Sequence, residues 1–222
     1  MANIKIRSAF SAQPSTARPN PFVERVIGHI DDHLYVKKRQ LSCADQGCGK
    51  LRHLPLLLRR FSTVVLIDTE EQLSRTQQIW RTPQTTIREY AKRLKVSGGL
   101  LSVVSSEEFE RSRLKLDVIF SVCVLDVEIP RARDRIVRAG YRNLTNGGLL
   151  VLIVPRNDQT ITVRCTGRNR FLDGHFFRHH GTVTFYRNFT KTADLKRLVE
   201  GAGFSVLDDL STYRQLCLVC RK

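Results

Sequence analysis

The sequence contains no apolar run that approaches the roughly 20 residues a helix needs to cross a bilayer. The N-terminus also lacks the apolar stretch of a secretory signal. From these two absences we expect no membrane association and a cytoplasmic location for the chain.

Cysteines are few, six in 222 residues, and Cys43, Cys123 and Cys217 lie inside apolar runs, where a thiol behaves as a small buried hydrophobe. We expect no disulfides. Cys217 and Cys220 have a C-x-x-C spacing, but they lie in a predicted strand, where residues three apart point to opposite faces. This spacing therefore predicts neither a metal site nor a redox site, and we expect no metal centre elsewhere in the chain.

Acidic residues are scarce relative to basic ones, because 21 Asp and Glu stand against 37 Lys and Arg, for a formal net charge of +16. Such an excess indicates an anionic partner. Nucleic acid is the commonest such partner, since each phosphate contact by Lys or Arg releases counterions and adds affinity. A nucleotide-like small substrate and simple solubility are the alternatives.

A length of 222 residues favours one domain with one sizeable core. Residues 1–20 are polar, carry no sustained period and are predicted to form a flexible arm. The apolar residues of segment 22–34 recur at helical spacing after a proline, which predicts a first helix. We assign residues 21–222 to a single domain.

Short apolar runs alternate with helical patterns over the middle of the chain. Strands are predicted at residues 41–45, 64–68, 100–104, 118–122 and 149–154, and helices at about 50–60, 70–80, 106–113 and 131–144. Strands that are apolar throughout and separated by helices are typical of parallel pairing with both faces covered. The pattern predicts an α/β fold with a doubly wound, mostly parallel sheet.

After Pro155 this regular patterning stops, and a segment rich in Arg, Gly, Asn and His predicts a basic lid or substrate loop at about 156–190. A helix is predicted at 192–202, followed by strands at 204–207 and 215–220. Because only a short turn separates the two strands, they must be antiparallel neighbours.

The segment after the first predicted strand, residues 45–49, reads D-Q-G-C-G. Glycines at 47 and 49 let the backbone turn sharply and approach a ligand, and free amides at the start of the next helix favour an anionic group such as a carboxylate. Asp45 would repel a pyrophosphate. S-adenosylmethionine has no phosphate and carries an ammonium and a sulfonium, so an acid at this position suits it.

Two phosphate-binding motifs are excluded at this turn. A dinucleotide site would have a third glycine where Arg52 stands. A P-loop would have a hydroxyl residue where Leu51 follows Lys50, and a glycine five residues before Gly49. Neither requirement is met.

A second acid, Asp68, closes the next predicted strand, 68 − 45 = 23 residues after Asp45. In a β-α-β unit its carboxylate would lie beside the glycine turn, where it could hold a ribose diol through two hydrogen bonds. The turn and the strand-ending acid together point to a nucleoside ligand without phosphate.

With these residues the chain resembles the class I S-adenosylmethionine-dependent methyltransferases from about residue 22 onward. The first motif of that family is an acid followed by alternating glycines. Further likenesses are residues 117–125, which resemble the family's fourth motif, residues 146–151, which resemble the turn into the fifth strand, and residues 195–204, which resemble its late helix. The resemblance implies a Rossmann-like, seven-stranded sheet with an antiparallel last strand, S-adenosylmethionine as cofactor, and methyl transfer as the activity.

The resemblance also implies a cofactor site made from four segments. The turn would hold the methionine end, the second strand end the ribose, the third strand end the adenine amino group, and the backbone of the fourth strand end the methionine moiety. The turn supplies Asp45, Gly47, Cys48 and Gly49, and the second strand end supplies Asp68 and Thr69. The third strand end supplies Ser106 and Glu107, and the fourth supplies Ser121 and Val122. Two departures from the family pattern are Leu51, where a third glycine is often found, and an acid displaced into residues 105–108.

The sequence indicates the acceptor and its binding residues less clearly than it indicates the cofactor site. Residues 121–124 read S-V-C-V where adenine methyltransferases have a D/N-P-P-Y type segment, and no Pro-Cys pair occurs, so both DNA-base chemistries are disfavoured. Positioning supplies much of the rate of an in-line displacement, and a general base is needed only if the acceptor holds its proton. His179, His180 and Tyr186 of the lid are the candidate catalytic residues, with surface positions as the alternative for the two histidines.

Two groups of arginines are candidates for binding an anionic acceptor. Those of the lid follow the carboxyl end of a strand, where open sheets bind ligands; they are Arg156, Arg168, Arg170 and Arg178. Those of the helix predicted at 131–144 form one stripe, for which a solvated face is the more usual explanation; they are Arg131, Arg135, Arg138 and Arg142.

Three functions stay open from the sequence. The preferred one is a methyltransferase acting on RNA or another nucleic acid, which the net charge of +16 and the basic lid favour. The second is a methyltransferase for a small molecule or natural product, which the modest size favours. The third is a non-catalytic module that binds nucleic acid or protein.

Overall fold

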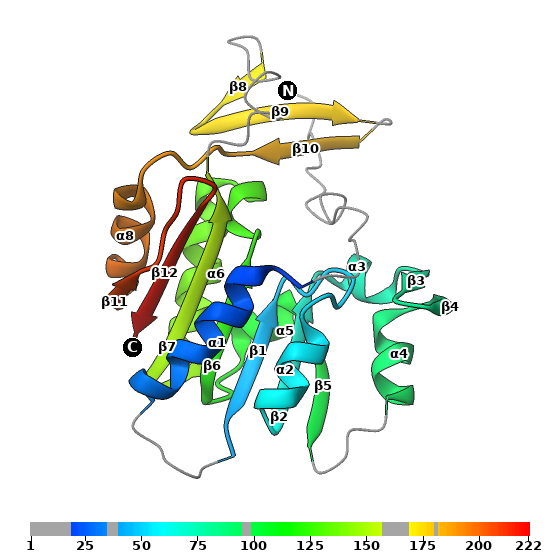
Figure 1. Cartoon of the computed structure of the whole chain (residues 1–222). Coiled ribbons are helices and arrows are strands. Elements are labelled where there is room, and N and C mark those ends of the chain that lie inside the picture. Colours follow the sequence, from blue (N-terminus) through cyan, green and yellow to red (C-terminus); the bar gives the residue numbers. More distant parts are fainter. Residues whose placement is uncertain (1–18, 35–39, 95–98, 157–168, 180–181) are drawn as a thin grey trace.

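The computed structural model describes residues 19–34, 40–94, 99–156, 169–179 and 182–222 (Figure 1). Most of the predicted N-terminal arm lies outside these ranges, as do Arg168 and His180. In the described part of the chain, no helix is long and apolar enough to span a membrane.

The main sheet has seven strands in the order β11-β12-β7-β6-β1-β2-β5. Its strands are β1 (Ser42–Gln46), β2 (Thr63–Asp68), β5 (Leu100–Ser105), β6 (Leu116–Val122), β7 (Leu144–Pro155), β11 (Ser205–Asp209) and β12 (Gln215–Arg221). The five strands from β7 to β5 are parallel, β12 is antiparallel to β7, and β11 is antiparallel to β12. The predicted doubly wound sheet with an antiparallel last strand is therefore confirmed.

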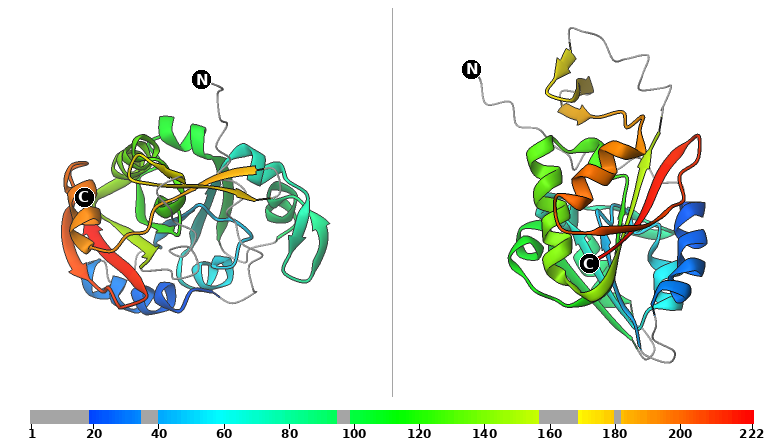
Figure 2. Two further views of the ribbon diagram at one scale, coloured as in Figure 1. Left: turned by 90° about the horizontal axis from the view of Figure 1, so that it is seen from above. Right: turned by 90° about the vertical axis from the view of Figure 1, so that its left-hand side faces the viewer.

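Helices cover both faces of this sheet, so its strands are apolar on both sides. One face carries α1 (Pro21–His33) and α2 (Leu54–Arg60), and the other carries α5 (Ser106–Arg111), α6 (Pro130–Asn143) and α8 (Thr192–Glu200). The right-hand view of Figure 2 shows α1 on one side of the sheet and α6 and α8 on the other. Cys217 and Cys220 belong to opposite core layers, as their spacing predicted.

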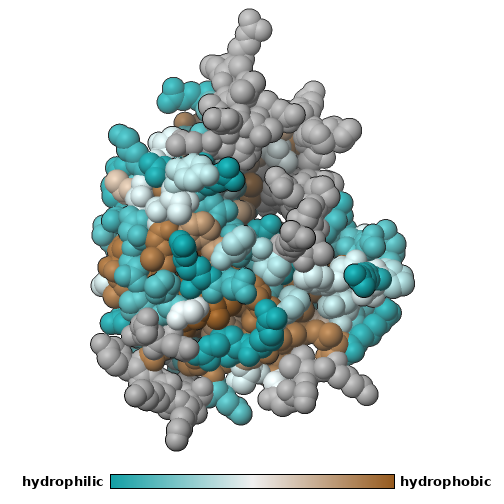
Figure 3. Space-filling model, in the orientation of Figure 1, coloured by the Kyte–Doolittle hydropathy of each residue, from teal (hydrophilic) through white to brown (hydrophobic). Residues whose placement is uncertain are grey.

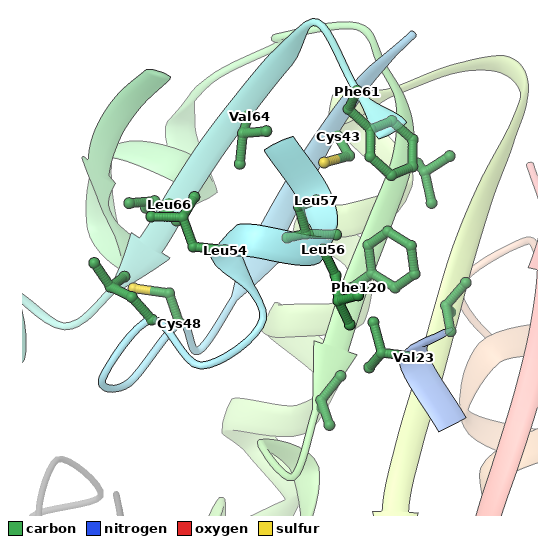
Figure 4. Close-up of a cluster of buried hydrophobic side chains, with 14 of the residues drawn as sticks. Val23, Cys43, Cys48, Leu54, Leu56, Leu57, Phe61, Val64, Leu66 and Phe120 are labelled. Carbon is green, nitrogen blue, oxygen red and sulfur yellow. The ribbon is translucent and has the colours of Figure 1, made fainter. Parts of the chain in front are cut away.

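The core layer under α2 is built around leucines and two phenylalanines. Leu54 and Leu57 of α2 point toward β1 and β2, and the rings of Phe61 and Phe120 meet edge to face with centroids 5.9 Å apart (Figure 4). This packing fixes the position of α2 along the strands of the sheet. It therefore also fixes the glycine turn, which leads into α2.

The predicted helix at 70–80 is wrong in its second half. Helix α3 (Glu70–Ser74) ends after five residues, and a hairpin of β3 (Gln77–Ile79) and β4 (Thr82–Thr85) follows, with Trp80 at φ 55° in its turn. A left-handed residue cannot continue a helix, so the chain reverses there. The hairpin leads to α4 (Ile87–Arg93), and Figure 3 shows hydrophilic side chains over this projection of the molecule.

The predicted loop at 156–190 is also wrong in part, because it contains a small antiparallel sheet. Its strands are β8 (Arg170–Phe171), β9 (Gly174–His179) and β10 (Thr182–Tyr186), in the order β10-β9-β8. We call these three strands the cap sheet. Phe, Thr and Val favour strands, but the pairing depends on turns whose residues gave no distinct signal. Figure 1 shows the cap sheet beyond the carboxyl ends of β6 and β7.

Candidate cofactor site

The turn after β1 requires glycine at one position for reasons of space. Gly47 has a φ of +76°, and a Cβ added to it would lie 2.3 Å from the Cγ2 atom of Val124. Gly49 also has a positive φ, +53°, but the nearest atom to an added Cβ is a backbone oxygen at 3.9 Å. The two glycines therefore differ: Gly47 is needed for a close approach of two segments, and Gly49 only for its backbone conformation.

The backbone amides of this turn are used within the protein. The amides of Gly47 and Cys48 both donate to the carbonyl of Ile67, at 2.8 and 3.0 Å, and the amide of Gly49 donates to Asp68 Oδ2 at 2.8 Å. These three amides bind the turn to β2 and are not free to face a ligand. Helix α2 also begins at Leu54, later than predicted, and the Cys48 side chain is buried in the core.

Asp45 has a buried carboxylate that accepts no hydrogen bond from the described residues. Its side chain is 1% exposed, and neither carboxylate oxygen has a hydrogen-bond partner. A basic side chain lies close by, because Nδ1 of His53 is 3.8 Å from Asp45 Oδ1. A buried carboxylate with so little compensation is costly to the folded chain, and a bound cation would offset that cost. This carboxylate fits the ammonium of S-adenosylmethionine.

His53 is a neighbour of Asp45 that the sequence did not mark. It precedes α2, is 5% exposed, and its Nε2 accepts a hydrogen bond from Nε of Arg52 at 3.0 Å. In the neutral ring this assigns the proton to Nδ1, the nitrogen that faces Asp45. In that tautomer His53 directs an N–H toward the carboxylate, at 3.8 Å, which is beyond hydrogen-bond distance.

Asp68 lies beside the same turn, as predicted. Its carboxylate accepts hydrogen bonds from the amides of Gly49 and Thr69, each at 2.8 Å. Burial raises the pKa of Asp68 to about 6, against the opposite effect of these two amides, and the charge of Asp45 contributes to the rise. The Thr69 hydroxyl caps α3 by accepting from the amide of Gln72 at 3.3 Å.

Gln72 and Gln77 form a second layer behind the turn. Nε2 of Gln72 donates to the carbonyl of Gly49 at 3.0 Å and to Oε1 of Gln77 at 3.3 Å. Both side chains are buried, at 1% and 6% exposed. No sequence pattern marked this pair, because both residues fell inside a single predicted helix.

The end of β6 approaches the turn from the other side. Ser121 lies opposite Gln46 of β1 in the sheet register, and its buried hydroxyl has no hydrogen-bond partner among the described residues. After Val122 the chain turns at Cys123, with φ 56°, and Val124 then packs against Gly47. Leu51, where the family often has glycine, also adopts a left-handed conformation, with φ 62°.

At the end of β5, the predicted adenine contacts stand at the start of α5. Ser105 caps this helix, and the side chain of Glu108 returns to the Ser105 amide at 2.8 Å and to its hydroxyl at 2.9 Å. The side chain of Glu108 is used in this helix cap. The residues of this segment that stay available to a ligand are Ser106 and Glu107. Ser106 is half-buried and Glu107 is exposed.

The predicted acceptor residues are only partly described. Tyr186 is buried in β10 and pairs with His175 of β9, whereas only the backbone of Arg178 and His179 is described. Arg170 is exposed in β8. The guanidinium of Arg156 donates to the carbonyls of Thr190 and Thr212, both at 3.2 Å, so it joins two loops.

The predicted arginine stripe on α6 is exposed to solvent. Arg138 pairs with Asp134 on its own helix at 2.9 Å, and Arg135 pairs with Glu110 at 3.7 Å. Between these exposed residues the helix carries a buried arginine, Arg133, that the sequence pattern did not distinguish from its neighbours.

Comparisons with known proteins agree with this fold. The chain matches no protein-family model. It is 26% identical over 212 residues to the uncharacterized protein YmfD of Escherichia coli (strain K12), covering 95% of this chain and 90% of that protein.

Many solved structures are similar to the chain, and three of them serve as examples. The 1,6-didemethyltoxoflavin-N1-methyltransferase of Burkholderia thailandensis, with bound S-adenosylhomocysteine, has a TM-score of 0.60 at 18% identity, covering 91% of this chain and 77% of its own. Magnesium protoporphyrin IX methyltransferase from Synechocystis also has a TM-score of 0.60, at 16% identity, with 91% and 82% covered. CalS10, an amino pentose methyltransferase from Micromonospora echinaspora, has a TM-score of 0.56 at 15% identity, with both chains fully (100%) covered. The chain therefore has the fold of the class I S-adenosylmethionine-dependent methyltransferases.

Proposed function

We propose that this chain is an S-adenosylmethionine-dependent methyltransferase that acts on a small-molecule acceptor. The observation that carries the proposal is the buried carboxylate of Asp45, which accepts no hydrogen bond from the described residues and lies next to the glycine turn. A cationic ligand without phosphate satisfies that carboxylate, whereas a nucleoside diphosphate would be repelled.

Each part of the site has a role in this proposal. Asp45 binds the ammonium of the methionine end, and Asp68 accepts hydrogen bonds from the ribose hydroxyls while its two amide bonds keep it in place. Ser106 and Glu107 face adenine, and the backbone at Ser121 and Val122 borders the methionine moiety. Gly47, Cys48 and Gly49 shape the floor of the site, with Thr69 at its edge.

The chemistry supplied by the bound cofactor is a methyl group on a positively charged sulfur. The chain's part is to hold an acceptor lone pair in line with the carbon–sulfur bond, so that the new bond forms as that bond breaks and S-adenosylhomocysteine leaves. If the acceptor loses a proton, Tyr186, His179 and His180 of the cap region are the candidates to take it.

The choice of a small acceptor rests on two considerations. The similar solved structures include enzymes named for a toxoflavin precursor, magnesium protoporphyrin IX and an amino pentose. The net charge of +16 and the arginines near the carboxyl edge favour an acceptor that is itself anionic. The arginines proposed to bind it are Arg156, Arg168, Arg170 and Arg178.

A nucleic-acid acceptor is the second candidate, and the net charge is the observation that favours it. The exposed arginines of α6 would then contact phosphates. Arg138 and Arg135 already have acidic neighbours, Asp134 and Glu110, which weakens this role for two of the four.

The test begins with calorimetry of the full-length chain titrated with S-adenosylhomocysteine, with Asp45→Ala as the matched control. We expect binding by the unsubstituted chain and binding weaker by about 1 to 3 kcal/mol in the variant, as loss of a charge-assisted hydrogen bond gives. No binding at millimolar ligand, or equal binding by both, would overturn the cofactor assignment.

The acceptor class is then read from label transfer. The chain is incubated with radiolabelled S-adenosylmethionine and fractionated cell extract, and label is followed into RNA, DNA, protein and small molecules. Label in the small-molecule pool supports the first proposal, and label in RNA the second. Binding without transfer to any fraction would indicate a non-catalytic module.

A further inference from the structure

Arg133 of α6 is the one described arginine that is nearly fully buried, at 2% exposed. Its Nε donates to the carbonyl of Leu125 at 2.8 Å, and its two terminal nitrogens donate to the two carboxylate oxygens of Asp173 at 2.6 and 3.1 Å. The guanidinium also lies 5.6 Å from the ring centre of Phe185 and 5.3 Å from that of Phe189. A buried arginine is tolerated when its donors are paired in this way.

The partners of Arg133 come from parts of the chain that the main sheet does not join. Leu125 begins the short helix η2 (Leu125–Val127), just after β6, and Asp173 lies in the turn between β8 and β9 of the cap sheet. Phe185 belongs to β10. Arg133 of α6 therefore contacts β10 of the cap sheet and the turn between β8 and β9. It also contacts η2, the segment that follows the predicted methionine contacts.

Arg187, just after β10, completes the arrangement. It also contacts Asp173, and it pairs with Asp194 in the first turn of α8 at 2.9 Å. Its backbone amide donates to the carbonyl of Asp126 in η2 at 2.7 Å. We call the four residues Arg133, Asp173, Arg187 and Asp194 the cap clamp; their formal charges sum to zero.

The pKa values of the two central groups agree with a persistent ion pair. Burial favours the neutral form of Asp173, but the hydrogen bonds from Arg133 and Arg187 outweigh it and hold the pKa of Asp173 below its ordinary value. Burial lowers the pKa of Arg133, yet a guanidinium stays charged at every pH where the protein is folded.

The cap sheet is small, which makes its position dependent on contacts with the rest of the domain. It consists of three strands of two, six and five residues, and a sheet of this size is marginally stable by itself. Its strands β9 and β10 pack closely at Gly174, since a Cβ added there would lie 2.4 Å from Cζ of Phe185 and 2.5 Å from the carbonyl oxygen of Tyr186. Figure 1 shows this sheet beyond the carboxyl ends of the strands that carry the cofactor residues.

We propose that Arg133 is a positioning residue, which holds the cap sheet at a fixed place beyond the carboxyl edge and so sets the binding of the methyl acceptor. The inference rests on the proposed function, because it takes the cap sheet as the acceptor side of the site. Asp45, Asp68 and the glycine turn are not part of the clamp. Loss of the clamp therefore weakens acceptor binding and leaves cofactor binding unchanged.

The test uses Asp173→Asn and Arg133→Lys in the full-length chain, with Arg138→Lys as the matched control on the exposed side of the same helix. Hydrogen exchange of residues 170–179 and 182–186 is compared with exchange of β1, β2 and β6, and S-adenosylhomocysteine binding is measured by calorimetry. We expect cap exchange to rise at least about tenfold in both clamp variants, with central strands unchanged and cofactor affinity within about twofold. The control behaves like the unsubstituted chain.

With the acceptor found by label transfer, the KM for the acceptor rises several-fold in Asp173→Asn, whereas kcat falls less, and Asp173→Glu recovers part of the loss. Unchanged cap exchange, or loss of cofactor affinity in parallel with acceptor affinity, would overturn the inference. If Arg133→Lys does not fold, Asp173→Asn decides, because Asp173 is partly exposed. A chain that binds no cofactor refutes the proposed function, but the cap exchange still reports on the clamp.

Discussion

Asp45 combines a structural cost with a proposed binding role. Its carboxylate is buried and accepts no hydrogen bond from the described residues, and a buried polar group without partners destabilises the folded chain. Natural proteins retain such groups where a ligand uses them, at the expense of stability.

The first prediction concerns Asp45→Asn. Removing the buried charge should raise the free energy of unfolding by about 1 kcal/mol, while S-adenosylhomocysteine binding weakens by about 1 to 3 kcal/mol. Chemical denaturation and calorimetry measure the two effects. Asp134→Asn, on the exposed side of α6, serves as control and should change neither. A loss of both stability and affinity would instead indicate a structural role.

The second prediction concerns pH and Asp68. Its pKa is raised from 3.8 to about 6, so the folded state binds the proton more tightly than the unfolded state. The contribution of Asp68 to the free energy of unfolding is therefore largest below pH 4 and is lost as the pH rises through about 6. Ribose binding needs the ionised carboxylate, so affinity for S-adenosylhomocysteine should increase over the same interval.

Calorimetry between pH 5 and pH 8 checks the affinity, with Asp68→Asn as the control whose affinity should be low and flat over this range. The increase in affinity of the unsubstituted chain should have its midpoint at about pH 6, the pKa of Asp68. An affinity that is independent of pH in the unsubstituted chain would separate Asp68 from ribose binding.

At the scale of elements, the glycine turn after β1 is joined to the ends of two other strands, β2 and β6. Amides of Gly47, Cys48 and Gly49 bind it to the end of β2, and Val124, after β6, packs against Gly47. The left-handed Leu51 and Cys123 lie on either side of this contact. The turn is thus a rigid junction, which suits a preorganised binding site.

The third prediction uses the contact between Gly47 and Val124. Gly47→Ala places a methyl 2.3 Å from Cγ2 of Val124 and should both destabilise the chain and reduce cofactor affinity at least about tenfold. Gly49→Ala meets no atom closer than 3.9 Å and should cost only the backbone strain, about 1 kcal/mol.

The double variant Gly47→Ala with Val124→Ala identifies the cause. Removing the Val124 methyls should restore most of the affinity lost on adding the Gly47 methyl, as a steric coupling between the two sites predicts. Additive losses in the double variant would show that the strained backbone of Gly47, rather than the contact with Val124, is what matters.

For the whole molecule, the open question is what the net charge of +16 serves. The arginine stripe belongs to α6, whereas Arg170 belongs to the cap sheet, so substitutions can separate their contributions. A small acceptor needs only the arginines beyond the carboxyl edge, whereas a nucleic acid would also use a remote exposed stripe.

The fourth prediction is that replacing Arg131 and Arg135 of α6 by Gln leaves methyl transfer within about twofold, because their charges are exposed and screened by salt. Arg170→Gln, in the cap sheet, should reduce transfer to an anionic acceptor several-fold. Initial rates at 150 mM salt provide the measurement. A tenfold loss from the stripe variant, with a steep salt dependence, would favour a nucleic-acid acceptor.

The parts of the fold that sequence reasoning predicted well are those whose signal is local. Strands β1, β2, β5, β6 and β7 each overlap a short apolar run, and α1 begins at Pro21 after the capping residue Asn20, so their places could be read from short patterns. The hairpin at Gln77–Thr85 and the cap sheet were missed, because strand pairing depends on turns and partners that neighbouring residues do not encode.

The sequence by itself determined the parallel sheet, the glycine turn and the placing of two acids beside it, since periodicity, glycine positions and strand ends are properties of the chain. Only the tertiary structure decided what each group meets. It assigned the turn amides to Ile67 and Asp68, left Asp45 without a hydrogen bond from the described residues, and buried Arg133 among four exposed arginines. Such distinctions depend on contacts between segments far apart in sequence, where burial and pairing are set by packing rather than by residue type.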